Sequence, residues 1–180
     1  DLNHDGVIDS NDQAPIGYNP VPEMTFSLAA GLNWKGIDFS ILLQGAARSS
    51  IYLQQDIAWD NFWGNYYEEH IGRWTPETAA TATYPRFTKA ATATHPNYYK
   101  SDYWLKDSKY LRLKNIQLGY TIPRKLLKKI GIRSLRVYTN AYNLLTWDNV
   151  KKVDPESPNN SNGQFYPQQK VINFGINLNF

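Results

Sequence analysis

Residues 1–12, DLNHDGVIDSND, gather the oxygen-bearing side chains that calcium prefers. With Asp1 as the first position of a calcium loop, oxygen donors fall at alternate positions, and Gly6 stands where such a loop must turn sharply. Ca²⁺ and Mg²⁺ both bind carboxylate, amide and carbonyl oxygens. The pattern therefore predicts a structural Ca²⁺ or Mg²⁺ site with the following ligands: Asp1, Asn3, Asp5, the Val7 carbonyl, Asp9 and Asp12.

Two features separate this loop from an EF-hand. Asp12 stands where an EF-hand has a bidentate Glu, and its shorter side chain should weaken the site. Pro15, Gly17 and Pro20 also break any helix that would follow the loop. An alternative interpretation needs no metal, because Asp and Asn side chains can close such a turn by accepting backbone hydrogen bonds.

A second group of candidate residues is aromatic and lies in residues 57–74, IAWDNFWGNYYEEHIGRW. Helical spacing would align Trp59, Phe62, Trp63 and Tyr66 on one stripe. Such a stripe more often packs a loop onto its neighbours, and that alternative is favoured over ligand binding. Aromatic rings also suit the apolar faces of sugars or peptide side chains, which makes four residues candidate substrate contacts: Trp59, Trp63, Tyr66 and Tyr67.

Catalytic patterns find little support. His4, His70 and His95 are isolated from one another and belong to no HExxH or nucleophile-elbow motif, so we expect all three at the surface. Glu68 and Glu69 are adjacent, and adjacent helical residues point in different directions, which makes them a poor acid–base pair. The sequence predicts a protein that is not an enzyme.

Composition excludes several classes of protein. The 180 residues contain no Cys, which rules out a disulfide framework and thiolate metal sites. The net charge of +3 is too small to indicate a nucleic-acid partner, and the basic stretch 124–136 is interpreted as a solvated turn. No apolar run reaches the eighteen or more residues that a membrane helix needs. The chain opens at Asp1, apparently inside a motif, and we expect it to be part of a longer protein.

Five segments alternate apolar and polar residues at period 2, which is the pattern of strands with one apolar face. In the last segment, Ile172, Phe174, Ile176, Leu178 and Phe180 alternate mostly with Asn and Gly. Eleven residues at about 3.3 Å each, tilted near 45°, span about 26 Å, which matches the apolar band of a membrane barrel. The predicted strands of this all-β, antiparallel fold are 24–34, 36–46, 110–122, 134–147 and 170–180.

The connections alternate between short and long. Residues 34–36 and 123–133 are short turns, whereas 47–109 and 148–169 are long loops. In an antiparallel order the short turns share one end of the sheet and the long loops share the other, as in outer-membrane barrels with short periplasmic turns and long extracellular loops. This order predicts a periplasmic carboxyl terminus and makes 1–23 part of another outer loop. Five strands cannot close a barrel, so further strands must come from elsewhere.

Several motifs together resemble the C-terminal part of the SusC/RagA family of TonB-dependent outer-membrane transporters of Bacteroidetes. The resemblance spans nearly the whole chain in order, and its most specific block joins SDYWL, YLRLKN and LGY. The matching stretches are DLNHDGVIDSND, GIDFSILLQGA, RWTPET, YPRF, SDYWLKDSKYLRLKNIQLGYTIP, GIRSLRVYTNAYNLLTW and YPQQKVINFGINLNF.

The resemblance implies the last five or so strands of a 22-stranded barrel that is plugged by an N-terminal domain. It also implies a SusD-like surface lipoprotein as partner, contact with outer-membrane lipid, and import of oligosaccharides or peptides with energy from the TonB complex. The segment that contacts TonB would lie outside this sequence. The acidic loop matches a recurrent feature of the family, which favours a structural metal.

The alternation is also consistent with a different class of protein. A secreted β-sandwich that binds calcium and carbohydrate would show the same alternation, with the apolar faces directed at a second sheet. A glycosidase is a more distant alternative, because it needs two carboxylates about 5–10 Å apart in a cleft and no such pair stands out.

Overall fold

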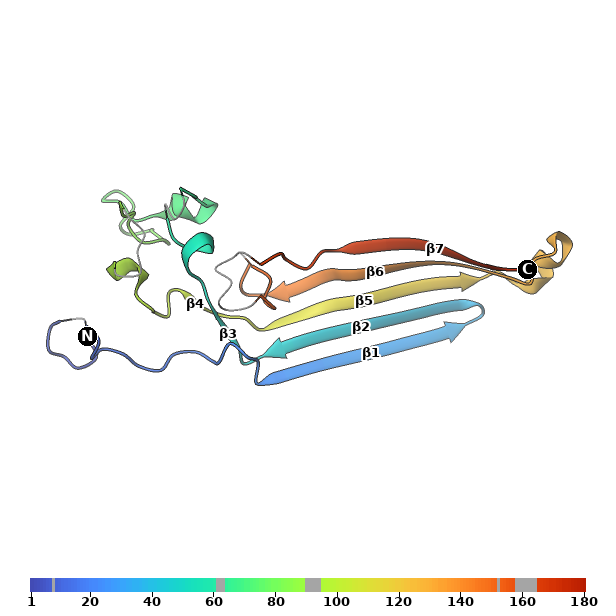
Figure 1. Ribbon diagram of the computed structural model, residues 1–180, viewed down its shortest axis with the longest axis horizontal. Coiled ribbons are helices and arrows are strands. Elements are labelled where there is room, and N and C mark those ends of the chain that lie inside the picture. The colour runs from blue at the N-terminus through green and yellow to red at the C-terminus, as the bar shows by residue number, and fades with distance from the viewer. Residues whose placement is uncertain (8, 61–63, 90–94, 152, 158–164) are drawn as a thin grey trace.

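One long antiparallel sheet dominates the structure, a computed structural model that describes residues 1–180 except 8, 61–63, 90–94, 152 and 158–164 (Figure 1). The sheet has five strands in the order β1-β2-β5-β6-β7, so neighbours in the chain are neighbours in the sheet. The predicted antiparallel β-structure is confirmed. The strands are β1 (Met24–Trp34), β2 (Ile37–Ala47), β5 (Tyr110–Thr121), β6 (Ser134–Asp148) and β7 (Val171–Asn179).

These bounds lie within one residue of those expected from the alternation. The chain order also leaves β1 and β7 at the two edges, so the sheet is open. An open edge exposes unpaired backbone N–H and C=O groups, which further strands could satisfy. Among the helices of the described residues, none is long and apolar enough to cross a membrane.

The strand register gathers the apolar side chains onto one face of the sheet. Leu28 pairs with Leu43, Leu43 with Leu113, and Leu113 with Leu145, and directly paired residues share a face. Many of the large side chains on this face are exposed, because no other element of the described residues covers the face. The exposed members include Phe26, Leu28, Leu32, Trp34, Leu118, Tyr120, Leu145, Trp147, Ile172, Phe174, Ile176 and Leu178.

A β-bulge at Lys114 keeps this face continuous. The pairing of β5 with β2 shifts between Leu113 and Asn115, so Lys114 has no partner in the ladder. One extra residue reverses the parity of the side chains that follow it. The bulge therefore brings Leu113 and Ile116, which are an odd number of residues apart, to the same face.

Short connections lie at one end of the sheet, beside the last residues of the chain (Figure 1). Lys35 and Gly36 form a two-residue turn with φ of 47° and 88°, and positive φ at both positions is typical of a tight hairpin. Gly36 also lies against the backbone of Thr121, which donates its N–H to the Gly36 carbonyl at 2.7 Å. The second connection contains a short helical stretch, which consists of α1 (Arg124–Leu127) and η4 (Lys128–Ile130).

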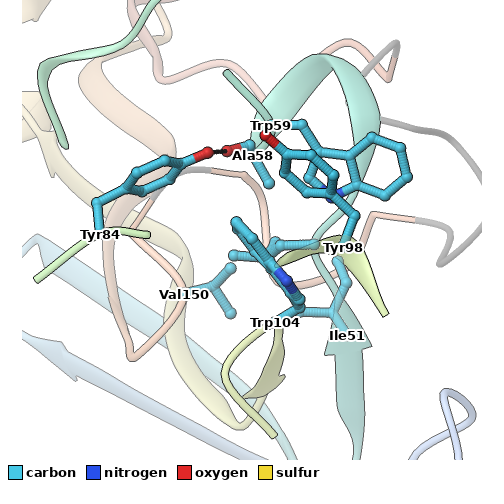
Figure 2. Close-up of a cluster of buried hydrophobic side chains, with 8 residues drawn as sticks. Ile51, Ala58, Trp59, Tyr84, Tyr98, Trp104 and Val150 are labelled. Carbon is cyan, nitrogen blue, oxygen red and sulfur yellow. Dashed lines mark hydrogen bonds between the residues drawn. The ribbon is translucent and has the colours of Figure 1, made fainter. Parts of the chain in front are cut away.

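The long loops form a small module at the opposite end (Figure 1). Its framework is a two-stranded sheet of β3 (Ser50–Tyr52) and β4 (Leu105–Asp107), with three short 3-10 helices: η1 (Gln55–Ile57), η2 (Glu68–Gly72) and η3 (Pro96–Tyr98). Figure 2 shows its hydrophobic core, which consists of Ile51, Leu53, Ala58, Trp59, Tyr84, Tyr98, Trp104 and Val150.

The helix considered for residues 57–74 is not formed. In the described part of this segment, η1 ends at Ile57, η2 begins at Glu68, and the described residues between them are not helical. Gly64 has a φ of 76°, which a right-handed helix cannot contain. The described members of the predicted stripe, Trp59 and Tyr66, are therefore not aligned by a helix, and Phe62 and Trp63 lie outside the described residues.

Candidate functional site

The acidic loop is curled by its own side chains. The Asp1 carboxylate accepts hydrogen bonds from the N–H groups of Asp5 (3.1 Å) and Gly6 (2.9 Å). Asn3 accepts from the Asp5 N–H at 3.0 Å and donates its side-chain amide to the Asp5 carboxylate at 2.8 Å. These bonds bring Asp1, Asn3 and Asp5 into one turn.

Asp12 closes the loop from its far end. Its carboxylate accepts from the N–H groups of Asp9 (2.8 Å), Leu2 (2.6 Å) and Asn3 (3.3 Å). These hydrogen bonds, the one from Asp9 first, lower the pKa of Asp12 because they favour the ionised carboxylate. The closure by Asx-type bonds that the sequence allowed is thus present.

The donors of this loop suit a hard cation, since carboxylate, amide and carbonyl oxygens are what Ca²⁺ binds. Within the described residues, no group of three or more His, Cys, Asp or Glu side chains is arranged to hold a metal ion. The carboxylates are instead engaged with backbone N–H groups. A cation would have to compete with those hydrogen bonds.

The aromatic candidates divide between the core and the surface of the loop module. Trp59 is 3% exposed and packs on Tyr98, with ring centroids 4.8 Å apart, so its ring serves the module core. Tyr66 and Tyr67 are exposed and available to a ligand. Trp63 lies outside the described residues.

A polar centre is buried within this aromatic core. Asp60, which is fully buried, receives the hydroxyl of Tyr98 and, at 3.0 Å, the N–H of Thr88. Tyr84 donates its hydroxyl to the Ala58 carbonyl at 2.8 Å (Figure 2). The same hydroxyl accepts the N–H of Asp60 at 3.0 Å. Burial raises the pKa of Tyr84, and the charge of Asp60 raises it further. These hydrogen bonds connect Asp60 to Tyr84, Thr88 and Tyr98, which are 24 to 38 residues away in the chain.

His70 corrects one expectation, because it is buried rather than at the surface. Its ring is enclosed by Tyr67, Tyr84 and Phe87. Its Nδ1 accepts the Tyr67 N–H at 3.0 Å, and its Nε2 lies 3.3 Å from the Ala58 carbonyl. An imidazole with both nitrogens engaged inside a core has a packing role, and an isolated His in the sequence carries no signal of that.

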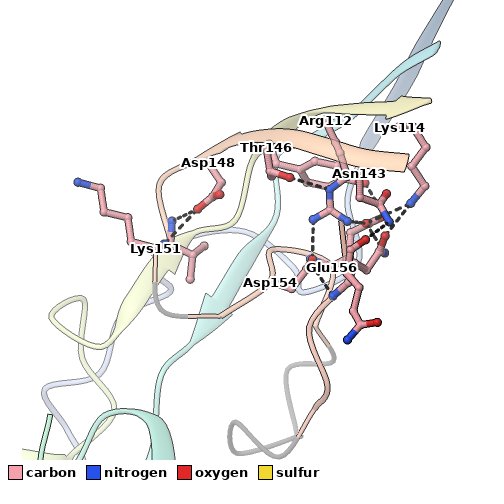
Figure 3. Close-up of polar contacts among 12 residues, drawn as sticks. Arg112, Lys114, Asn143, Thr146, Asp148, Lys151, Asp154 and Glu156 are labelled. Carbon is pink, nitrogen blue, oxygen red and sulfur yellow. Dashed lines mark hydrogen bonds and ion pairs between the residues drawn. The ribbon is translucent and has the colours of Figure 1, made fainter. Parts of the chain in front are cut away.

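Arg112 ties the second long loop to the sheet (Figure 3). Its guanidinium, 2% exposed, binds Asp154 at 2.8 Å and Glu156 at 2.5 Å, and its Nε donates to Thr146 at 3.0 Å. Lys114 adds a contact to Glu156 at 3.6 Å. All three guanidinium nitrogens therefore donate hydrogen bonds, which attach Asp154 and Glu156 of the loop to β5.

The polar face of the sheet carries a second ion pair. Arg136 of β6 binds Asp38 of β2 through two hydrogen bonds of 2.9 and 2.5 Å. The pair crosses β5 directly over Gly119, where an added Cβ would collide with both charged groups. A glycine at this position lets two strands that are not neighbours interact.

Sequence reasoning missed these tethers. Asp154 and Glu156 lie more than 40 residues from Arg112 in the chain. Asp38 and Arg136 are 98 residues apart. The signal in the sequence was limited to charged residues on the polar parity of strands that otherwise carry few charges.

Curated TonB-dependent receptors are similar to this chain over its whole length. TonB-dependent receptor P26 of Formosa agariphila is 30% identical over 196 residues, which cover 100% of this chain and 19% of the receptor. TonB-dependent receptor SusC of Bacteroides thetaiotaomicron is 25% identical over 182 residues, covering 100% of this chain and 17% of SusC. No protein-family model matches the chain.

Solved structures share the fold. A chain in the RagAB peptide importer in its open-open state superposes with a TM-score of 0.71 and 24% identity, over 97% of this chain and 19% of that chain. The RagAB peptide transporter gives a TM-score of 0.72 with 22% identity over 96% of this chain. At these identities the likeness establishes the architecture.

The sheet with one exposed apolar face and the similarity over the whole of this chain define the class as TonB-dependent receptors. The relatives are named as receptors and importers and not as enzymes. The chain belongs to the SusC/RagA family and corresponds to a segment of its members. It spans 17% to 19% of the length of the curated relatives that it matches.

Proposed function

We propose that this chain forms part of the barrel wall and outer loops of a TonB-dependent importer in the bacterial outer membrane. The observation that supports it is the uncovered apolar face of an open sheet whose strands are long enough to cross the apolar layer. Aromatic residues border this face, with Trp34 and Tyr120 near the short turns and Phe26 and Trp147 near the long loops. Such girdles mark the two interfaces of membrane barrels.

The proposed orientation places the short turns and Phe180 in the periplasm. It rests on the separation of short and long connections to opposite ends of the sheet (Figure 1). In barrels of this class the long, structured loops face outward. The loop module would then lie at the cell surface, and the polar face with Asp38 and Arg136 would line the lumen. Closure of the barrel to 22 strands would use the free edges of β1 and β7.

The cargo class that we propose is oligosaccharides or peptides. The relatives include SusC and structures described as a peptide importer. A SusD-like lipoprotein over the loop module and the TonB complex on the periplasmic side would be the partners. Tyr66 and Tyr67, both exposed, remain the proposed substrate contacts on the described surface. Uptake assays of the full-length protein with peptide and oligosaccharide mixtures would separate the two cargo classes.

The β-sandwich alternative requires a second sheet against the apolar face. The two-stranded β3–β4 sheet belongs to the loop module, and the apolar side chains stay exposed in the described structure. That exposure favours contact of this face with lipid over packing against a second sheet.

A pair of adjacent substitutions in the full-length protein tests the proposal. Phe174, at the middle of β7, is 83% exposed on the apolar face, whereas Asn173 is on the polar face. F174R should cost about 2–4 kcal/mol at the bilayer midplane and reduce the folded, heat-modifiable protein in outer-membrane fractions. N173R places the same charge toward the lumen and should assemble nearly as well as the parent. If the parent and N173R were both soluble without detergent and F174R alone lost soluble protein, the sandwich would be supported instead.

We also propose that the acidic loop binds a divalent cation with structural effect. Its support is the turn in which Asp1, Asn3 and Asp5 already converge. Calorimetric titration of the full-length protein with Ca²⁺ should give a dissociation constant on the order of 10⁻⁴ to 10⁻³ M, the range of extracellular modules. A double variant D1N/D5N should lose this heat, whereas D102N, an exposed Asp of the loop module, should retain it. Equal heats in all three proteins would leave the loop as an Asx-closed turn.

A further inference from the structure

The turn between β5 and β6 concentrates positive charge. Its Lys and Arg side chains are exposed, and in the described residues none of them forms an ion pair. The sequence from Tyr110 to Trp147 contains no Asp or Glu that could neutralise them. Lys35 adds to the group, because its turn is bonded to Thr121. The cations of the turn itself are Arg124, Lys125, Lys128, Lys129 and Arg133.

Apolar side chains are exposed among these cations. Leu126 is 69% exposed and Ile130 is 64% exposed, one helical turn apart, while Leu127 between them is buried. Basic and apolar residues mixed on one short helical segment are typical of an element that lies in a membrane interface.

The position of the turn fits such an interface. It lies between Tyr120 and Val137, which pair with each other and both belong to the apolar face of the sheet. The exposed rings of Trp34 and Tyr120 border the same end. The turn therefore continues the surface that faces lipid into the zone where phosphate groups lie.

We propose that residues 123–133 form a lipid anchor, in which Leu126 and Ile130 enter the headgroup boundary and the cations bind the phosphates of anionic phospholipids in the periplasmic leaflet. This inference rests on the proposed function and orientation. The positive charge of the turn favours an anionic lipid as its ligand, since each Lys or Arg near an anionic leaflet contributes about 1 kcal/mol of attraction. Asp38, the acid among the strands near this end, is already paired with Arg136.

Native mass spectrometry of the full-length protein in detergent tests the anchor. Phosphatidylglycerol and phosphatidylcholine are added separately, and retained lipid adducts are counted. We expect the parent protein to retain phosphatidylglycerol preferentially. K125Q/K128Q/K129Q should weaken its retention on the order of a hundredfold, by about 1 kcal/mol for each lysine. K100Q/K151Q/K170Q removes the same charge at the loop end and should keep the preference.

The outcomes separate this inference from the proposed function. If folded, heat-modifiable protein shows no preference for phosphatidylglycerol, or if both triple variants lose it equally, the anchor is wrong and the barrel stands. If the protein is soluble without detergent and retains neither lipid, the proposed function fails. A third variant, L126S/I130S, should weaken phosphatidylglycerol retention without changing heat-modifiability. Loss of thermal stability in this variant with unchanged lipid retention would show that the turn packs on protein instead.

Discussion

At the scale of single residues, two arginines link segments of this chain that are far apart in the sequence. Arg112 binds Asp154 and Glu156, and Arg136 binds Asp38, each through hydrogen bonds as well as charge attraction. Ion pairs with little exposure are costly to break, because the remaining partner is left desolvated. These two residues therefore define the position of the second long loop and the alignment of β2 with β6.

Removing Arg112 should release the loop. In R112M, Asp154 and Glu156 lose their buried partner, and we expect a loss of about 3–5 kcal/mol in the free energy of unfolding. Limited proteolysis of the full-length protein should then cut residues 153–157, and the melting temperature should fall. R48Q is the matched control, since Arg48 makes an exposed pair with Glu23 at 3.8 Å, and such a pair contributes less than about 1 kcal/mol. Equal stability of the two variants would mean that the loop is held by other contacts.

At the scale of elements, the strands were predictable and the loops were not. Strand bounds followed from the alternation, because in the proposed barrel one face of each strand meets an apolar medium and the other a polar one. Each residue of a strand therefore carries information about its own face. The loop segment 57–74 offered helical spacing, yet its Asp60 and His70 are buried in a core that also contains Tyr84, from a separate stretch of the chain. Its conformation depends on contacts that no local pattern contains.

The bulge in β5 makes a prediction at this scale. Deleting Lys114 restores the simple two-residue period, so Leu111 and Leu113 should turn to the polar face while Ile116 and Leu118 stay outside. The full-length deletion variant should fail to reach the outer membrane in folded form, as judged by heat-modifiability. Deletion of Lys100, in an exposed stretch of the loop module, is the control and should be tolerated. Normal assembly of the Lys114 deletion would show that register is set elsewhere.

At the scale of the whole molecule, the described sheet keeps its apolar face and both edges uncovered. Residues 1–180 produced alone should therefore remain aggregated without detergent, because lipid and partner strands are missing. In detergent, size-exclusion chromatography should still show mixed oligomers, since unpaired β1 and β7 can join other copies. A monodisperse, detergent-free monomer of this chain would contradict the membrane assignment.

The amino-acid sequence by itself determined the five strands, their faces and the tight turn at Lys35-Gly36, because alternation and positive φ preferences act over a few neighbouring residues. It also carried the motifs of the SusC/RagA family. Only the tertiary structure decided that Trp59 and His70 are core residues, that Arg112 anchors the second loop and that Gly119 makes room for the Asp38–Arg136 pair. Each of those depends on segments brought together from far apart in the chain, and the energy of such contacts is invisible until the register of the sheet places them side by side.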